Sequence, residues 1–140
     1  MTDAWNARYG DNPITEIPEL ASFLSHRSVR HYEDKPIDDD TLTSLVAVAQ
    51  SAATSSNLQL WSIIEVSQGP LREKIAELCG RQKSILTCAR FLAFCADTNR
   101  MHLAGAMHHI ETKGLSTMEF LLMSVIDASL AAERLVCADI

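Results

Sequence analysis

Residues 117–138 read TMEFLLMSVIDASLAAERLVCA and constrain the fold more than any other stretch of the chain. Their apolar side chains recur with the period of an α-helix. These positions are Met118, Leu121, Leu122, Val125, Ala128, Ala132, Leu135 and Val136. The pattern predicts a helix of about 22 residues that is apolar around most of its circumference and needs cover from several other elements. We expect this cover to come from a partner subunit, or from a longer domain of which this chain is the front part.

Three shorter helices and two strands are predicted upstream of this helix. The helices are expected over 18–27, 40–53 and 71–79, and the strands over 61–66 and 91–96. An N-cap and first-turn negative charge for the second helix are offered by Asp38, Asp39, Asp40 and Thr41. Gly80 offers a C-terminal cap for the third helix. Residues 91–96 are apolar throughout, which is typical of a strand buried on both faces. Residues 99–114 show no clear pattern.

The composition is that of one ordinary globular domain. Of the 140 residues, 47% are hydrophobic and 21% are charged, a balance that argues against disorder. The formal net charge of -6 argues against nucleic-acid binding, because non-specific binding depends on cationic side chains that meet phosphates. We therefore expect no nucleic-acid partner.

The four cysteines of the sequence contain no C-x-x-C pair; they are Cys79, Cys88, Cys95 and Cys137. A zinc site would need histidine partners such as His102, His108 and His109, and no ligand spacing connects these residues. We interpret the cysteines as free thiols in a reducing compartment and expect no metal site.

The first twelve residues, MTDAWNARYGDN, are polar and lack an apolar signal core. No run of about 18 uncharged apolar residues occurs anywhere in the chain. We therefore expect a cytoplasmic protein that has no membrane partner.

A cluster of cationic and hydroxyl side chains lies at the end of the first predicted helix. His26, Arg27, Ser28 and Arg30 fall within five residues of an otherwise acidic chain. A guanidinium group offers a planar fork of donors that fits phosphate oxygens, and a serine hydroxyl adds another donor. The cluster therefore favours a phosphate or carboxylate ligand. The alternative is a solvated helix end, because cations near a helix C-terminus also complement the helix dipole.

A polar stretch, Thr54-Ser55-Ser56-Asn57-Leu58-Gln59, separates the second predicted helix from the first strand. Its hydroxyl and amide groups can hydrogen-bond the polar edge of a planar heterocycle. An ordinary helix-to-strand turn has the same composition and stays open as the alternative. The sequence shows no G-x-S-x-G or H-E-x-x-H motif and no paired carboxylates, so we expect no catalytic residue of a hydrolase.

Taken in order, these segments resemble the nitroreductase family, in particular its NADPH-dependent nitroreductase and flavin reductase group. The main matches are His-Arg-Ser-Val-Arg at 26–30, Ala-Thr-Ser-Ser-Asn-Leu-Gln at 53–59 and Gly-Arg-Gln-Lys at 80–83. Further matches are Phe-Cys-Ala-Asp at 94–97 with Asn99 and Arg100, and Glu119–Leu122 with Val125, Asp127 and Ala128. Several motifs in the same order are more specific than any one of them alone.

The resemblance implies an α+β fold with helices around a central sheet, and a homodimer that holds one FMN per site between its subunits. By this resemblance, His26, Arg27, Ser28 and Arg30 bind the FMN phosphate and ribityl chain. Ser55, Ser56 and Asn57, with Gln59 in the same loop, come from the other subunit and lie around the flavin ring, and Gln82 lies beside that ring.

The chemistry that the resemblance implies is a ping-pong reaction. NADPH, or NADH, delivers a hydride to flavin N5, and the reduced flavin then passes electrons to a nitroaromatic, a quinone or a free flavin. The cofactor does this chemistry, so the protein needs to supply no acid or base.

Members of the family continue beyond the long helix with glycine-containing motifs, further strands and a Lys-x-Arg pair. We therefore expect residues 1–140 to form a single nitroreductase-like domain that is truncated after the helix 117–138 and lacks part of the flavin site. The alternative is a helical dimerisation module that binds no flavin.

Overall fold

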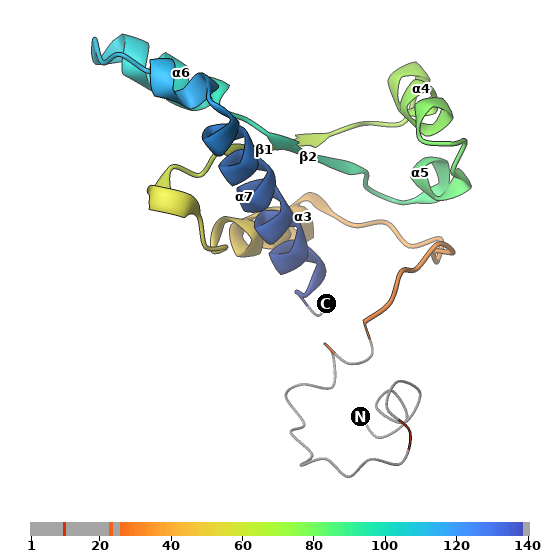
Figure 1. The fold of residues 1–140 in the computed structure, drawn as a ribbon. Helices are drawn as coiled ribbons and strands as arrows, with labels where there is room; N and C mark the ends of the chain where they lie inside the picture. The colour runs from red at the N-terminus through yellow and green to blue at the C-terminus, as the bar shows by residue number, and fades with distance from the viewer. Residues whose placement is uncertain (1–9, 11–22, 24–25, 139–140) are drawn as a thin grey trace.

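The computed structural model describes residues 10, 23 and 26–138, and Figure 1 colours them by position along the chain. The elements are α3 (Asp39–Gln50), η2 (Ser55–Asn57), β1 (Trp61–Glu65), α4 (Pro70–Leu78), α5 (Lys83–Thr87), β2 (Leu92–Ala96), α6 (Asn99–Met107), η3 (Lys113–Ser116) and α7 (Met118–Val136). The elements η2 and η3 are short 3-10 helices.

The strands β1 and β2 form an antiparallel pair in which Trp61 lies opposite Ala96 and Glu65 lies opposite Leu92. Helix α7 contacts both strands and also packs on α3. Helices α4 and α5 lie beyond one end of the strand pair, and α6 lies beyond the other end (Figure 1). The segment before β1 and the segment after it are therefore separated by the length of the sheet.

The core lies where α7 meets α3 and the sheet. Ala49 of α3 and Ala131 of α7 are fully buried in one cluster with Trp61 and Ala128. Alanines at the contact let the two helices approach closely, because the distance between packed helices depends on the side chains between them. The rings of Trp61 and Phe94, on neighbouring strands, lie with their centroids 6.4 Å apart.

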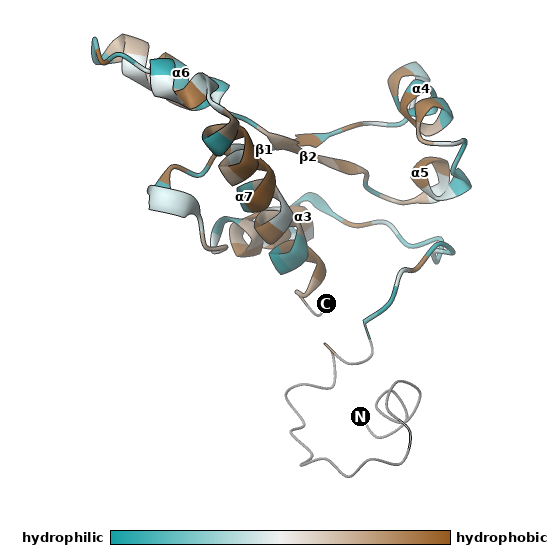
Figure 2. Cartoon of the chain, in the orientation of Figure 1, coloured by the Kyte–Doolittle hydropathy of each residue, from teal (hydrophilic) through white to brown (hydrophobic). Residues whose placement is uncertain are grey.

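The predicted helix over 117–138 is confirmed as α7, and part of its apolar surface is exposed. Five side chains that are each between 43% and 57% exposed make up what we call the apolar face of α7: Leu121, Leu122, Val125, Ile126 and Leu130. Brown, for hydrophobic residues, dominates much of this helix in Figure 2. The described elements leave this face uncovered. Nevertheless, within the described part of the chain, no helix has the combined length and apolarity that crossing a bilayer requires.

Helix α3 begins within one residue of its predicted start and ends earlier than predicted. Its N-cap is Asp38, whose carboxylate accepts a hydrogen bond from the Thr41 N–H at 2.7 Å, and this bond holds the pKa of Asp38 below its ordinary value. At the other end, both the N–H and the hydroxyl of Ser51 donate to the Val48 carbonyl. The prediction of helix to residue 53 is wrong, because the Ala52 N–H then turns to the carbonyl of residue 49 instead of Val48.

Helix α4 matches the prediction over 71–79 to within one residue and ends in the predicted glycine cap. Gly80 has a left-handed φ of 76°, which glycine adopts without steric cost. The Arg81 N–H reaches back to the Ala76 carbonyl at 2.8 Å, as in a Schellman motif.

Strands β1 and β2 match the predictions over 61–66 and 91–96 to within one residue, whereas the remaining elements depart from the predictions. Helices α5 and α6 and the 3-10 helix η3 are not predicted by the sequence pattern. Strand β2 is half-buried and not buried on both faces, because α7 provides most of its cover among the described elements. The predicted helix over 18–27 falls mostly outside the described residues, and residues 26 and 27 are not helical.

Candidate functional site

The loop between α3 and β1 has an unusual backbone. Ser56, Asn57 and Gln59 have φ angles of 51°, 54° and 51°, in the left-handed region that residues with a side chain seldom adopt. The side chains of Ser55, Ser56, Asn57 and Gln59 are all exposed. The Gln59 side-chain amide donates to Asn57 Oδ1 at 3.4 Å. The loop therefore presents hydroxyl and amide groups to solvent from a backbone that needs external support.

A buried carboxylate lies beneath this loop. Asp127, in the middle of α7, is 1% exposed, and it accepts the Ser55 N–H at 3.0 Å through Oδ1. It accepts the Leu60 N–H at 3.1 Å through Oδ2. The side chain of Leu60 is itself fully buried, so the end of the loop is fixed both by its backbone and by its side chain.

Residues that follow β2 hold the same stretch from the other side. The Leu60 carbonyl accepts the Asp97 N–H at 2.9 Å. The Arg100 guanidinium, on α6, donates to the Gln59 carbonyl and, at 3.2 Å, to the Trp61 carbonyl. The backbone around Leu60 is therefore held by Asp127 on its N–H side and by α6 and its N-terminal flank on its carbonyl side.

The carboxylate of Asp97, beside the backbone around Leu60, has a shifted pKa. The Ser62 hydroxyl donates to one carboxylate oxygen and the Asn99 N–H donates to the other at 2.9 Å. These bonds, with the Ser62 bond the largest cause, and the nearby charge of Arg100 hold the pKa of Asp97 below its ordinary value.

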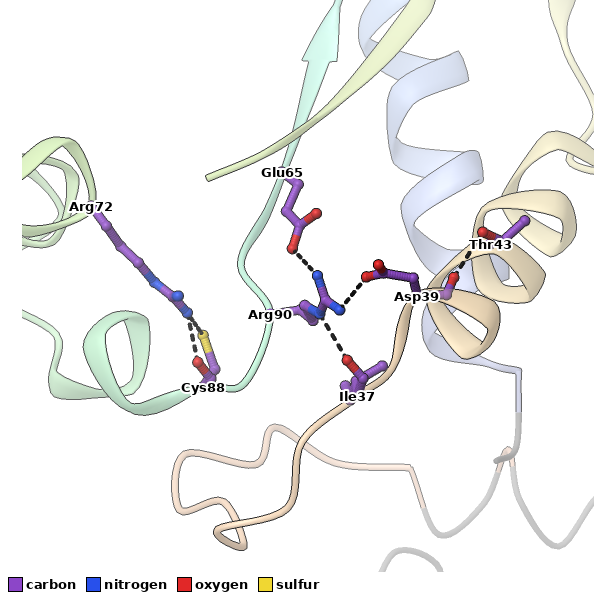
Figure 3. A network of polar contacts seen from close by, with 7 residues as sticks. All are labelled: Ile37, Asp39, Thr43, Glu65, Arg72, Cys88 and Arg90. Atoms are coloured by element: carbon purple, nitrogen blue, oxygen red, sulfur yellow. Dashed lines mark hydrogen bonds and ion pairs between the residues drawn. The ribbon is translucent and has the colours of Figure 1, made fainter. Parts of the chain in front are cut away.

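The cationic segment 26–30 is exposed and has no regular secondary structure. Among the described residues that follow it, the first anchor is at Ile37, whose carbonyl accepts the Arg90 Nε–H at 2.9 Å. Arg90 also pairs with Asp39 at 2.5 Å and with Glu65 at 2.7 Å, and these carboxylates, Glu65 first, raise the pKa of Arg90 (Figure 3). Arg90 thus connects the segment before α3, which follows residue 30, with the end of β1.

Gln82 is exposed at the N-cap position of α5. This short helix is held by Arg72 of α4, a guanidinium that is 2% exposed. Its Nη2 donates to the Cys88 carbonyl at 2.7 Å (Figure 3). Its Nε donates to the Ile85 carbonyl at 2.7 Å, and the guanidinium lies 5.7 Å from the centre of the Phe91 ring. Gln82 therefore belongs to a segment that a buried arginine fixes in place.

The structure places the predicted site residues in three separate groups. The loop at residues 55–59 precedes β1, whereas Gln82 follows α4, beyond the other end of that strand (Figure 1). Within the described part of the chain, no hydrogen bond connects residues 26–30, the loop and Gln82. A five-residue strand spans about 17 Å, so the loop and Gln82 of one chain do not form a single pocket.

The residues that support these groups are not among the predicted site residues. Asp127, Arg100, Arg72 and Arg90 each bond the backbone of a predicted site segment or of its flank. For Asp127 a signal does exist, because it is an acidic residue within an apolar helical stretch, and such a residue needs partners inside the protein.

A cavity of about 460 Å³ lies beside the loop. Its walls are mainly apolar and include Leu58 of the loop, Met101 and Ala104 of α6, and Phe120 of α7. His108 and Glu111 add polar groups to its lining. A cavity of this size and character suits a small, mainly apolar ligand.

The cysteines and histidines form no comparable arrangement in the described residues. Cys79 is exposed, and Cys88, Cys95 and Cys137 are half-buried free thiols. His102 Nδ1 lies 2.8 Å from the Thr112 hydroxyl, within hydrogen-bond distance. Residues 10, 23 and 26–138 contain no group of three or more side chains arranged to hold a metal ion.

Comparison with known proteins identifies relatives along most of the chain. The sequence model of the nitroreductase family matches residues 24–135. The oxygen-insensitive NADPH nitroreductase of Salmonella typhimurium is 36% identical over 121 residues, which are 86% of this chain and 48% of that protein. The FMN reductase (NADPH) of Bacillus subtilis is 34% identical over 117 residues, which are 83% of this chain and 47% of that protein.

Solved structures agree with these relatives. The structure of NfrA1 from B. megaterium is 36% identical and covers 85% of this chain and 49% of its own, with a TM-score of 0.81. The likeness confirms the expected α+β nitroreductase fold. The chain spans about half the length of the curated relatives that it matches. Since the family model covers most of the chain and the fold agrees with it, the chain belongs to the nitroreductase family.

Proposed function

We propose that the protein is an FMN-dependent NAD(P)H oxidoreductase that reduces nitroaromatics, quinones or free flavins by a ping-pong reaction. The observation that carries this proposal is the loop at residues 55–59, whose exposed hydroxyl and amide groups are supported by a buried carboxylate. The names of two relatives, an NADPH nitroreductase and an FMN reductase, support the choice of cofactor and electron donor.

The donor set of the chain fits FMN. Arg27, Ser28 and Arg30, with His26, would bind the phosphate and the ribityl chain, because guanidinium and hydroxyl groups donate to phosphate oxygens. Arg27 and Arg30 are both exposed, and the four ion pairs between described residues involve neither of them.

The loop and Gln82 would hold the ring. The hydroxyls of Ser55 and Ser56 and the amides of Asn57, Gln59 and Gln82 both donate and accept, as the polar edge of a flavin requires. Bound FMN would supply the group that takes a hydride from NAD(P)H and returns the reducing equivalents to a second substrate. The residues of this chain would bind and orient, and none of them would act as an acid or base.

The active form is a homodimer in this proposal. The loop and Gln82 lie beyond opposite ends of β1, so a site that uses both needs the loop of one subunit and Gln82 of the other. The apolar face of α7 supports the same assembly, since large exposed apolar patches commonly mark interfaces. Free thiols in the described residues support a reducing compartment such as the cytoplasm.

The electron acceptor in this proposal is a planar aromatic compound. Nitroaromatics, quinones and flavins share that shape, and the mainly apolar cavity beside Leu58 offers a surface for it. Turnover rates with a nitroaromatic, a quinone and a free flavin decide among these three classes, and rates with NADPH and with NADH decide the electron donor.

The proposal is tested by titrating FMN into the purified protein. Arg27→Ala and Arg30→Ala should each weaken binding by about tenfold to a hundredfold, because each removes a charge-assisted bond of about 1.5 to 3 kcal/mol. Lys74→Ala is the control, since Lys74 pairs with Glu77 within α4. An unchanged Kd in both arginine variants would exclude the segment 26–30 as the phosphate site.

The second candidate function, a dimerisation module without flavin, is favoured by the exposed apolar face of α7 alone. It predicts a colourless dimer that does not respond to added FMN, whereas the oxidoreductase carries the visible absorbance of a flavin. Sedimentation tests the dimer itself. The wild-type protein should sediment as a dimer at micromolar concentration, and Val125→Lys should dissociate it, because it places a charge in an apolar interface.

A further inference from the structure

We propose that Asp127 is a positioning residue, which from inside the core sets the conformation in which the loop at residues 55–59 meets the flavin. This inference rests on the proposed function, because it takes the loop to be part of the flavin site. It assigns to Asp127 no contact with FMN or substrate.

The local sequence does not favour the conformation of the loop. Ser56, Asn57 and Gln59 have left-handed φ angles between 51° and 54°, and none of them is glycine. That region is unfavourable for residues with a side chain, and such residues persist only where the surrounding structure over-determines them. The selection must therefore come from contacts that the loop makes elsewhere.

Asp127 makes those contacts. Its two oxygens accept the N–H groups of Ser55 and Leu60, at 3.0 and 3.1 Å. Ser55 and Leu60 lie on either side of the three left-handed residues. The carboxylate therefore fixes the distance between the two ends of the left-handed segment. The four ion pairs between described residues do not include Asp127, and its hydrogen bonds in this part of the chain go to the loop.

The partners of the loop act on opposite sides of its backbone. Asp127 takes N–H groups from the buried side, whereas Arg100 donates to the carbonyls of Gln59 and Trp61 from an exposed position. The peptide group between Gln59 and Leu60 is thereby held at its N–H by Asp127 and at its carbonyl by Arg100. With the backbone polar groups turned toward Asp127 and Arg100, the side chains of the left-handed residues remain exposed for a ligand.

The test replaces Asp127 by asparagine, which has the same shape. One acceptor oxygen becomes an amide nitrogen that can only donate, so one loop N–H loses its partner. The matched control is Ser124→Ala. Ser124 is also 1% exposed on α7, and within the described part of the chain its hydroxyl bonds only the Leu121 carbonyl of its own helix. Three quantities are measured in each protein: amide hydrogen exchange at Ser55 and Leu60, the Kd for FMN, and the visible spectrum of bound FMN.

In Asp127→Asn we expect exchange at Ser55 or Leu60 to accelerate about tenfold or more, and the Kd for FMN to rise by about tenfold to a hundredfold. The spectrum of bound FMN should shift, because the groups around the ring move. Far-UV circular dichroism should remain that of the wild type, and Ser124→Ala should change neither the Kd nor the spectrum.

Unchanged exchange at both amides in Asp127→Asn would overturn the inference, as would faster exchange with an unchanged Kd and spectrum. Neither result would affect the proposed function, which fails instead if the wild-type protein binds no FMN. If Asp127→Asn does not fold, Arg100→Gln tests the same arrangement from the exposed side. Arg100→Gln should also accelerate amide exchange and raise the Kd for FMN. If neither quantity changes, the inference is overturned.

Discussion

Truncating Leu60 to alanine should destabilise the protein strongly, because its side chain is fully buried. The substitution removes three carbons from a site with no solvent exposure. Substitutions of this kind cost about 3 kcal/mol, the sum of lost apolar transfer and the cavity left behind. For a chain of 140 residues the entropy of unfolding is about 0.3 kcal/mol per degree, so the melting temperature should fall by about 10 °C.

Thermal unfolding followed by circular dichroism measures this effect, with Leu78→Ala as the control. Leu78 is 75% exposed on α4, and the same truncation there should change stability by about 0.5 kcal/mol or less. Leu60→Met keeps the volume and should cost less than about 1.5 kcal/mol. Equal shifts for Leu60→Ala and Leu78→Ala would show that Leu60 is not part of the core and would refute the reasoning.

Three further predictions concern the surroundings of the site. Arg90→Gln should speed tryptic cleavage within residues 27–35, because it releases the Ile37 carbonyl and removes both ion pairs. The contribution of Asp97 to stability should be complete above its unfolded pKa of about 3.9 and should be lost as the pH falls through its lower folded pKa. Urea unfolding at a series of pH values between about 2 and 6 measures this loss in the free energy of unfolding. Gly105→Ala should lower the melting temperature, because the added Cβ would overlap Cγ2 of Thr112 and lie 3.1 Å from the carbonyl oxygen of residue 110.

Each of these predictions has its own control. Lys74→Gln removes an ion pair inside α4 and should leave the tryptic pattern before α3 unchanged. Ser62→Ala removes the hydroxyl that lowers the pKa of Asp97 most, so the protein should lose less stability as the pH falls. An equal loss in the wild type and in Ser62→Ala would contradict the role of the Ser62 hydroxyl. Thr112→Ser deletes the methyl group that a residue at 105 would meet, and it should restore part of the stability of Gly105→Ala.

Local signals were sufficient for the elements whose ends are marked by side chains or glycine. The Asp38 cap and the Gly80 cap lie next to the helices that they delimit, so a short window of sequence contains both the helix and its signal. Helix α5 has five residues, which is too few for a period to emerge. Helix α6 contains Gly105, a residue that weakens helices, and its close contact with Thr112 is a tertiary contact that no local pattern records.

The site divides in the same way. Side chains that offer phosphate or amide chemistry, such as Arg30 and Asn57, can be proposed from residue type and order. The residues that hold them cannot be found by spacing, because Asp127 bonds loop residues that are 72 and 67 positions earlier in the chain. Arg90 likewise bonds a carbonyl 53 positions away. Such pairs become neighbours only when the chain is folded.

The alanine contact between α3 and α7 sets a spacing as well as a core. Ala49 and Ala131 are both fully buried, and neither has a torsion angle by which a side chain could adjust. The separation of the two helices is therefore a property of their backbones. Asp127 lies one turn before Ala131 on α7, and the loop that it bonds follows α3, so a larger residue at either alanine would lengthen the bonds to Ser55 and Leu60 together. The two methyl groups thus contribute to the spacing between the long helix and the loop as well as to the core.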